Sequence, residues 1–546
     1  MKPLRPLFLA ALAIAVPSPE LRAQCGPDVL QELAAGDPQP GAKLGRSVAL
    51  DADTLVAGAP TADLNVNGFN VRGATYVWRR VGGTWLPEAK IPGPAAPKTY
   101  FGSGVDVSGD VLLAGGFSGS FPYERAWIYR RNGSNWIQEA ELTAGDPLTA
   151  GSTVPHDVAV EGVWAAVGHY KNKGTPVSSE STGAVYVYRF DGSTWSQVEK
   201  LVPSDAGSGD QVGWNVELAG GVLAYDSRTA ATFEPGRVHV HRVVGTSLVP
   251  EATLTAPDPL QGLDFGYGLS CDGARIAVSD IADTTLAGHQ GAVHVFVHTP
   301  GGWVLEQSLR PFVPAGTSAQ FGQEVALDGD DLVVSGTKTL GGVARLWHFR
   351  RVGGVWVELG QGALPATPGY DVEGLDLESG VVAVGSPTSD LPEVDSGAVY
   401  LFDPASSQPV CTYCTGKLNS QGCVPSIGWS GAPSAGAGSG FVISAAGLVP
   451  GNNGLLFYGT GGPQATPFLG GTLCAGSPIT RTNIQNSGGA APCSGTFAMD
   501  FNAWIAAGSD PTLVVGAQVG AQYWSRDVPA SFGSSVSDAI GFVVLP

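Results

Sequence analysis

One unit of sequence recurs along most of this 546-residue chain and constrains its fold more than any other feature. The clearest copies open with Phe-Gly, continue with alternating apolar residues, turn sharply and enter a second apolar run. The intervals between copies are roughly 50 to 58 residues, a period typical of propeller blades. Seven copies begin near Leu44, Phe101, Val154, Val212, Phe265, Phe321 and Tyr370.

Each copy contains enough sequence for four short strands. After the first two strands comes a Gly followed by alternating apolar residues and, in most copies, a Trp, as in Gly183 to Tyr188 followed by Trp195. Gly or Asp at the tight turns tolerates the positive φ of a short hairpin. A single four-stranded sheet cannot bury both of its faces, so we expect the copies to stack around an axis.

The two ends of the repeat array predict how the ring closes. The seventh copy stops at Asp403-Pro404 without a fourth strand, whereas the segment from Gln31 to Pro38 matches Ala140 to Pro147, which follows a complete fourth strand. We therefore expect the N-terminus to supply the missing strand of the last blade. Such a closure removes the open sheet edges that invite aggregation.

Composition and charge narrow the classes of protein. The chain has 78 Gly and 40 Pro with only 14% charged residues, which favours many short strands joined by turns and gives little support for helix. The net charge is -19, while the part after Val410 is close to neutral. An acidic surface repels phosphate backbones, so we expect no nucleic-acid partner.

The N-terminal segment has the pattern of a signal peptide. Lys2 and Arg5 precede an apolar run from Leu7 to Val16, which ends in Pro and small residues near Ala23. The run is shorter than the about 20 residues that span a bilayer, and no later segment approaches that length. We expect a secreted chain (extracellular, cell surface or periplasm) with no membrane insertion.

The cysteines fit an exported protein with disulfide bonds. After cleavage of the signal peptide an odd number remains, which leaves at least one thiol unpaired within the chain. The Cys411-Thr-Tyr-Cys414 motif is also compatible with redox chemistry or half a zinc site, but no second such motif or His pair accompanies it. The seven are Cys25, Cys271, Cys411, Cys414, Cys423, Cys474 and Cys493.

The sequence after the repeats predicts a separate module. Pro404 to Pro409 is rich in turn-forming residues, and the remainder alternates apolar and small residues in short runs separated by Gly, Pro and Asn. We therefore predict an all-β chain: a seven-bladed β-propeller with N-terminal strand closure, then a small antiparallel β-sandwich. The expected divisions are 1–23 signal peptide, 24–403 propeller, 404–410 linker and 411–546 Cys-containing sandwich.

The repeat resembles a known family. Phe-Gly at its start, with Val-Ala-Gly-Ala-Pro60 or Val-Gly-Ser-Pro387 at the close of its second strand, resembles the FG-GAP repeat of secreted bacterial proteins and of the integrin α-chain head. The resemblance covers about Val29 to Asp403 and implies a propeller. Residues 411–428 and 454–462 resemble a C-terminal module of exported planctomycete proteins, which implies no known activity.

A calcium site is one candidate for chemistry. The resemblance implies an Asp-x-Asp-x-Asp-Gly loop between the first two strands in calcium-binding members, but the turns here are too short to hold it. Asp63, Asn65 and Asn67 alternate before Gly68, the start of a calcium-loop pattern without its distal Glu. An Asn- and Gly-rich turn is the simpler interpretation, so we expect no cofactor, with calcium as the weak alternative.

Two further sets of side chains suggest packing more than chemistry. His239, His241, His294 and His298 have metal-ligand types, yet His239 and His294 occupy a position held by Tyr in other copies. Five Trp recur at one repeat position and could offer a sugar-stacking platform, although packing between blades explains them better. They are Trp85, Trp136, Trp195, Trp303 and Trp356.

Three functional hypotheses remain open, because the motifs of nucleophilic and metal hydrolases are absent. The leading one is a non-catalytic, monomeric binding or adhesion-type protein that presents the loops Thr61 to Arg72, His169 to Thr182 and Asp280 to Gln290 to an extracellular protein or glycan. The second is an extracellular polysaccharide hydrolase or lyase, which clustered channel carboxylates with raised pKa values would favour. The third is a structural cell-surface component, which a large exposed apolar patch would favour.

Overall fold

The computed structural model describes most of the chain from residue 28 onward. The description covers residues 28–63, 71–95, 99–117, 124–145, 157–170, 182–207, 209–228, 235–258, 262–284, 291–311, 319–337, 344–364, 372–390, 392–461 and 463–546.

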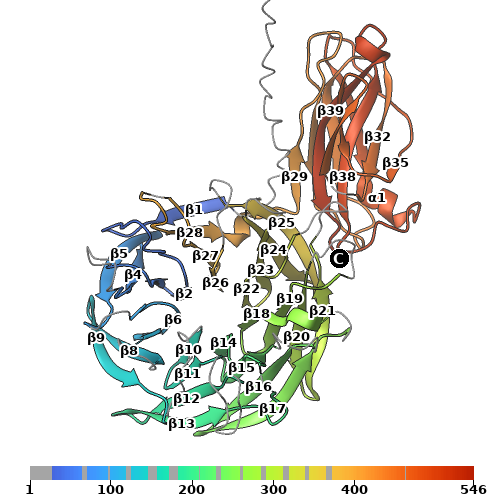
Figure 1. Ribbon diagram of the computed structural model, residues 1–546. Helices are drawn as coiled ribbons and strands as arrows, with labels where there is room; N and C mark the ends of the chain where they lie inside the picture. Colours follow the sequence, from blue (N-terminus) through green and yellow to red (C-terminus); the bar gives the residue numbers. More distant parts are fainter. Residues whose placement is uncertain are drawn as a thin grey trace, which may run out of the picture.

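Seven four-stranded antiparallel sheets, the blades, form a ring in the described part of the chain (Figure 1). Blades 1 to 3 consist of β2 (Val48–Asp51), β3 (Thr54–Ala59), β4 (Ala74–Val81) and β5 (Thr84–Pro92); β6 (Val105–Ser108), β7 (Val111–Phe117), β8 (Glu124–Asn132) and β9 (Asn135–Leu142); and β10 (Val158–Glu161), β11 (Trp164–Gly168), β12 (Val185–Phe190) and β13 (Trp195–Leu201).

The remaining blades have the same order of strands from the centre outward. Blades 4 to 6 consist of β14 (Val216–Ala219), β15 (Val222–Ser227), β16 (Arg237–Val244) and β17 (Ser247–Thr255); β18 (Phe265–Cys271), β19 (Arg275–Asp280), β20 (Ala292–Thr299) and β21 (Gly302–Leu309); and β22 (Val325–Asp328), β23 (Asp331–Thr337), β24 (Ala344–Val352) and β25 (Val355–Ala363). Blade 7 has β26 (Gly374–Glu378), β27 (Val381–Ser386), β28 (Ala398–Asp403) and, outermost, β1 (Asp28–Leu33).

Ring closure by the N-terminal strand is confirmed. β1 pairs antiparallel with β28, from Asp28 opposite Asp403 to Leu33 opposite Val399. The Gln31 side chain bonds both the backbone N–H and C=O of Trp85, at 2.9 and 2.8 Å. Gln307 in blade 5 makes the same pair of bonds to Trp356 in blade 6, so β1 acts as an ordinary outer strand.

The glycine before each third strand explains part of the repeat. Gly73 has a φ of +73°, and its Cα lies so close to the backbone of Phe101 in the next blade that no side chain fits. Gly183, Gly291 and Gly397 approach the next blade in the same way. The close approach of this backbone position to the next blade therefore requires a residue without Cβ, which accounts for the Gly at this point of the repeat.

The chain after the propeller forms a second β module (Figure 1). Its larger sheet has the order β29-β39-β38-β32-β35 with β36 beside β32, and its smaller one β30-β31-β37. Residues of both sheets share one apolar core that includes Phe441, Tyr458 and Phe542, which is the arrangement of a sandwich. The strands are β29 (Val410–Tyr413), β30 (Ser426–Ser430), β31 (Val442–Leu448), β32 (Asn453–Gly459), β33 (Pro463–Phe468), β34 (Gly471–Ala475), β35 (Ile479–Arg481), β36 (Gln485–Asn486), β37 (Gly495–Asp500), β38 (Gln518–Arg526) and β39 (Ser534–Val543).

Helix is scarce. The described residues contain one α-helix, α1 (Phe501–Ala506), and the 3-10 turns η1 (Gly262–Asp264), η2 (Pro404–Ser406) and η3 (Ser531–Gly533). Within the described ranges no helix is long and apolar enough to cross a membrane.

The two disulfide bonds whose cysteines both belong to the described ranges lie in the C-terminal module. Cys414 bonds to Cys474 and Cys423 to Cys493, and each bridge joins segments that are 60 or more residues apart. Cys271, in the propeller, is a buried free thiol, as the odd number of cysteines requires. The module therefore has covalent cross-links, whereas the described propeller depends on packing and hydrogen bonds.

The module contacts the propeller at blade 6. Val357 and Leu359 on β25 are buried in one cluster with Val543 of β39. In blades 1 and 2 the residues that follow the repeated Trp, Leu86 and Ile137, are about half exposed. The module thus covers a surface of blade 6 whose counterparts in those blades face solvent.

Candidate functional site

The inner strands of all seven blades surround a central cavity of about 740 Å³. The strands run side by side around the axis, so equivalent repeat positions meet at the same depth in the channel (Figure 1). We define two ends. The hairpin mouth lies where each inner strand turns into the second strand, and the rim lies at the opposite end, two residues before the first core residue of each inner strand.

The hairpin mouth carries a repeated acceptor. In five blades a carboxylate or hydroxyl at the end of the inner strand accepts a backbone N–H from the turn of the next blade, so this position links neighbouring blades. The bonds are Asp51 to Gly109, Ser108 to Gly162 (3.3 Å), Glu161 to Gly220 and Gly221 (2.9 Å each), Asp328 to Ser379 (2.9 Å) and Glu378 to Ala52 (3.3 Å).

Three acids within the channel make the same kind of bond to the next blade. Asp157 accepts from Val216 of the next blade at 2.9 Å. Asp106 and Asp376 accept in the same way, at 2.5 and 2.6 Å. Burial raises the pKa of Asp157 to about 7 and that of Asp376 to about 6, although the backbone donors oppose the shift. These acids link the blades, and their raised pKa values follow from their depth.

Glu217 and Glu324 differ from these linking acids. Both line the channel half-buried, and no hydrogen bond reaches either carboxylate from the described residues. Burial raises the pKa of Glu324 to about 8, against the influence of Arg46. Burial, with repulsion from Asp157, raises the pKa of Glu217 well above its usual range. They are therefore the channel acids whose chemistry the fold leaves unused.

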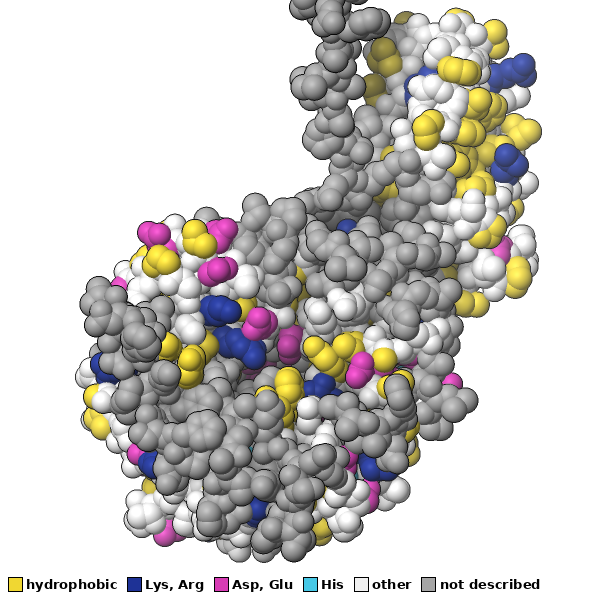
Figure 2. Space-filling model, in the orientation of Figure 1, with side chains coloured by type: hydrophobic (Ala, Val, Ile, Leu, Met, Phe, Trp, Pro, Cys, Tyr) yellow, Lys and Arg dark blue, Asp and Glu magenta, His cyan; other side chains and the backbone are white. Residues whose placement is uncertain are grey.

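The rim contrasts with the hairpin mouth in its variety. In the six blades whose rim position is described, each rim side chain is different, half-buried and in the lining of the channel. The position equivalent in blade 3 is His156, outside the described residues. Near the centre of the propeller in Figure 2, acidic, basic and hydrophobic side chains lie close together. The rim residues are Arg46, Ser103, Trp214, Tyr267, Gln323 and Glu373.

The aromatic side of the rim is held by an arginine. The Arg228 guanidinium lies over the ring of Trp214 at 4.8 Å and over that of Tyr267 at 4.9 Å. Its Nε pairs with Asp226 at 2.9 Å. Tyr170 meets Trp214 edge-on, with ring centroids 4.4 Å apart. Cation–π contacts on two rings and the ion pair fix this part of the rim before any ligand arrives.

The charged side of the rim lies on blades 7 and 1. Arg46 Nε and Glu373 Oε2 form an ion pair at 3.0 Å, with both side chains about one-third exposed. The rim thus offers aromatic rings on blades 4 and 5, an amide on blade 6 and paired charges on blades 7 and 1.

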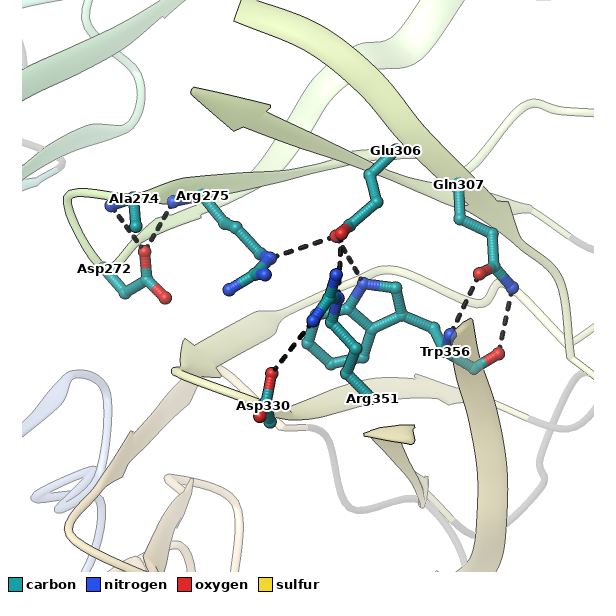
Figure 3. Close-up of polar contacts among 8 residues, drawn as sticks. All are labelled: Asp272, Ala274, Arg275, Glu306, Gln307, Asp330, Arg351 and Trp356. Atoms are coloured by element: carbon teal, nitrogen blue, oxygen red, sulfur yellow. Dashed lines mark hydrogen bonds and ion pairs between the residues drawn. The ribbon is translucent and has the colours of Figure 1, made fainter. Parts of the chain in front are cut away.

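The recurring Trp residues join the blades at the outside of the ring. Trp356 Nε1 donates to Glu306 of the preceding blade at 2.9 Å, and Arg275 and Arg351 bind the same carboxylate (Figure 3). Packing between blades is therefore confirmed as their role. Equivalent bonds join Trp136 to Glu88, Trp195 to Glu139 and Trp303 to Glu251.

The histidines also make structural contacts. His239 is buried, bonds Ser227 at 3.0 Å and stacks on Tyr225, and burial lowers its pKa to about 4. His294 bonds Ser308 at 2.8 Å and is buried as well. His241 also stacks on Tyr225, and His298 bonds Glu251 at 2.9 Å. Each ring thus has a partner in its own or the neighbouring blade.

The candidate calcium residues fall partly outside the described residues. Asn65 and Asn67 lie there, as do parts of the three candidate contact loops. Asp63 Oδ1 accepts from Lys90 at 2.7 Å and from Gln39 at 3.0 Å. Across the described ranges no three His, Cys, Asp or Glu side chains are placed to hold a metal ion. Calcium at this turn stays a prediction.

The sequence contained a signal for the rim that motif searching misses. With the seven copies aligned, the residue two positions before the first core residue differs from copy to copy, whereas the residue before it is Gly in five of the seven copies. Variation at one position of an otherwise regular repeat marks a position that the fold does not determine.

The ring of four-stranded blades defines the class: this is a β-propeller protein. The FG-GAP repeat model matches residues 29–78, from β1 into β4. The chain is therefore a β-propeller protein that carries an FG-GAP repeat. No curated protein matches it.

Solved structures are similar in fold. The β-propeller domain of the Trilobed protease from Pyrococcus furiosus has a TM-score of 0.39 and 10% identity, over 66% of this chain and 95% of that one. A prolyl endopeptidase has a TM-score of 0.42 and 12% identity, over 75% of this chain and 54% of that one. Sqt1 from Chaetomium thermophilum has a TM-score of 0.38 and 13% identity, over 69% of this chain and 99% of that one. Similarity at this level concerns the fold alone.

Proposed function

We propose that this chain is a secreted, monomeric, non-catalytic binding protein whose propeller presents its rim to an extracellular protein or glycan. The observation that carries the proposal is a contrast between the two ends of the inner strands: at the hairpin mouth five blades repeat one bond to the next blade, through Asp, Glu or Ser, while the rim side chain differs in each of the six blades where it is described. A scaffold position needs one residue type, whereas a binding position needs a particular set.

The acidity of the chain supports the choice of partner. With a net charge of -19, the surface disfavours nucleic acid and other polyanions. The two disulfides described in the C-terminal module suit an oxidising compartment.

A binding screen tests the proposal. The mature chain, residues 24–546, is screened against a glycan array and cell-surface extracts, with and without calcium. We expect binding that does not need calcium and that is lost when Arg46, Trp214 and Tyr267 are all replaced by Ala. Substitution of Leu86 and Ile137, which are exposed on the outer strands, is the matched control. Equal binding by the rim variant would contradict the proposal.

A polysaccharide hydrolase or lyase is the second candidate. Glu217 and Glu324 favour it, because raised pKa values keep an acid protonated near neutral pH, as general acid catalysis requires. The linking acids weigh against it, since their carboxylates already bind backbone N–H groups. Release of reducing ends from a polysaccharide panel by the natural chain, and its loss in Glu217→Gln or Glu324→Gln, would favour the enzyme over the binding protein.

A further inference from the structure

The size and depth of the rim limit what can enter it. The channel that opens at the rim has a volume of about 740 Å³, within the about 300–1,000 Å³ of sites for small ligands. A stable protein interface instead buries about 800 Å² on each partner, over a broad surface. The six rim side chains are all half-buried, so they are accessible to a narrow group that projects into the mouth and not to a flat surface.

The chemistry of the rim alternates apolar faces with planar polar groups. Trp214 and Tyr267 are adjacent around the ring, and the Arg228 guanidinium covers one face of each ring, so a sugar can stack only on the ring surface that Arg228 leaves open. Next to them, Gln323 supplies an amide, and Glu324, one residue deeper, a carboxyl without a hydrogen-bond partner in the described structure. Aromatic rings pack on the C–H faces of sugars, while amides and carboxyls bond hydroxyl groups.

The charge of the channel selects among sugars. Below the rim the channel is lined by Asp106, Asp157, Glu217 and Asp376, and none of these has a basic partner in the described ion pairs. Of the two basic groups described at the rim, Arg46 is paired with Glu373 and Arg228 with Asp226. Whether ionised or protonated, these carboxyls supply no positive charge to bind an acidic, sulfated or phosphorylated chain, while they can bond the hydroxyl groups of a neutral sugar.

We propose that the rim binds the end of a neutral saccharide chain, with Trp214 and Tyr267 as its stacking platform and Gln323 and Glu324 as its hydroxyl partners. The inference rests on the proposed binding function and deepens it by naming the ligand class.

Isothermal titration with defined sugars tests the inference. The probes are the neutral hexamers of glucose (β-1,4 and α-1,4), mannose, xylose and N-acetylglucosamine, with hexagalacturonate as the anionic control. We expect at least one neutral hexamer to bind and hexagalacturonate not to bind. Trp214→Ala and Tyr267→Ala should each weaken binding by tenfold or more, whereas Trp214→Phe should retain most of it.

The controls separate stacking from damage to the fold. Trp429→Ala removes a 41% exposed Trp on β30 of the C-terminal module and should leave binding unchanged. Thermal melting of each variant shows whether the propeller is intact. Binding of hexagalacturonate alone, or neutral binding that is insensitive to both rim substitutions in folded variants, would overturn the inference.

Failure of the inference can be told from failure of the proposed function. If no saccharide binds, but a purified extracellular protein binds and loses affinity with Trp214→Ala, the rim is a protein-binding site: the inference is wrong and the proposed function stands. If neither saccharides nor proteins bind in a way that depends on the rim, both are wrong.

Discussion

The two ends of the propeller channel are built by the same inner strands, yet they follow opposite rules. At the hairpin mouth, acceptors such as Asp51, Glu161 and Asp328 repeat one bond to the next blade. At the rim, the described blades place unlike side chains at one equivalent position. In a repeat fold, a position with the same contact in most blades serves stability, whereas a position whose side chain differs between blades is not determined by the fold.

Deletion of residues 28–36 is the most severe test, because it removes the strand that holds both ends of the channel in a closed ring. The variant loses the β1–β28 pairing and the Gln31–Trp85 bonds, and exposes the edge of β28. We expect a loss comparable with the about 5–15 kcal/mol total stability of a domain. Circular dichroism melting and light scattering would show an unfolded or aggregating propeller.

A synthetic peptide of residues 28–36, added to the deleted chain, is the control, since it can restore the strand without restoring the covalent link. An unchanged melting temperature in the deleted chain would mean that the ring does not need its closing strand.

Removing a linking acid has the next largest expected effect. Asp157→Ala leaves the N–H groups of Val216 and Val158 without their acceptor, which costs about 1–3 kcal/mol. Asp157→Asn keeps an acceptor oxygen and should cost less than about 1 kcal/mol. Urea unfolding measures both, and Ser103→Ala at the rim is the comparison. Equal loss from the rim variant would break the distinction between the two ends.

The pH dependence of stability sharpens the comparison. The pKa of Glu324 is raised from 4.5 to about 8 in the folded chain, so the folded state binds the proton more tightly than the unfolded state does. Stability is therefore lost as pH rises from about 4.5 to 8, because ionisation opposes folding. Glu324→Gln should raise stability at pH 8 by about 1–3 kcal/mol, with channel water limiting the gain, and leave it nearly unchanged at pH 4. A larger gain at pH 4 would contradict the sign.

The smallest expected change in stability comes from replacing a tryptophan that joins two blades, Trp356, or a tryptophan at the rim, Trp214. Trp356→Phe removes a donor from the half-buried Glu306 and should cost about 1 kcal/mol. Trp214→Phe keeps its ring contacts with Arg228 and Tyr170 and should change stability by less than about 0.5 kcal/mol. Melting temperatures of both variants provide the measurement. A greater loss at Trp214 would assign the rim a structural role.

Most of the fold was predictable from the repeat itself. The four-stranded unit, its Trp packing and the closing N-terminal strand follow from periodic sequence, because each copy must satisfy the same neighbour contacts. The helix α1 was not predicted. It is only six residues long, and its N-cap Asp500, which accepts from the Ala503 N–H, cannot be told from the Asp residues of turns by sequence alone.

The candidate site was less predictable for a physical reason. Asp157 directly precedes the inner strand β10 and Glu217 lies in the inner strand β14, and only the three-dimensional register shows that Asp157 bonds the next blade while Glu217 has no such bond. Arg228, which fixes Trp214 and Tyr267, lies at the end of a second strand and not in the rim column. The sequence shows which residue types are present, but the distances between side chains of different blades are known only from the structure of the closed ring.

The pairing of β1 with β28 joins residues 28 and 403. In a chain made from its N-terminus, the first strand must wait, unpaired, until almost four hundred residues have emerged. Closure is then the step of highest contact order, and we expect it to be among the last and slowest steps of folding. The seam is also where the C-terminal module begins, so the propeller completes its ring only as the chain enters its second module.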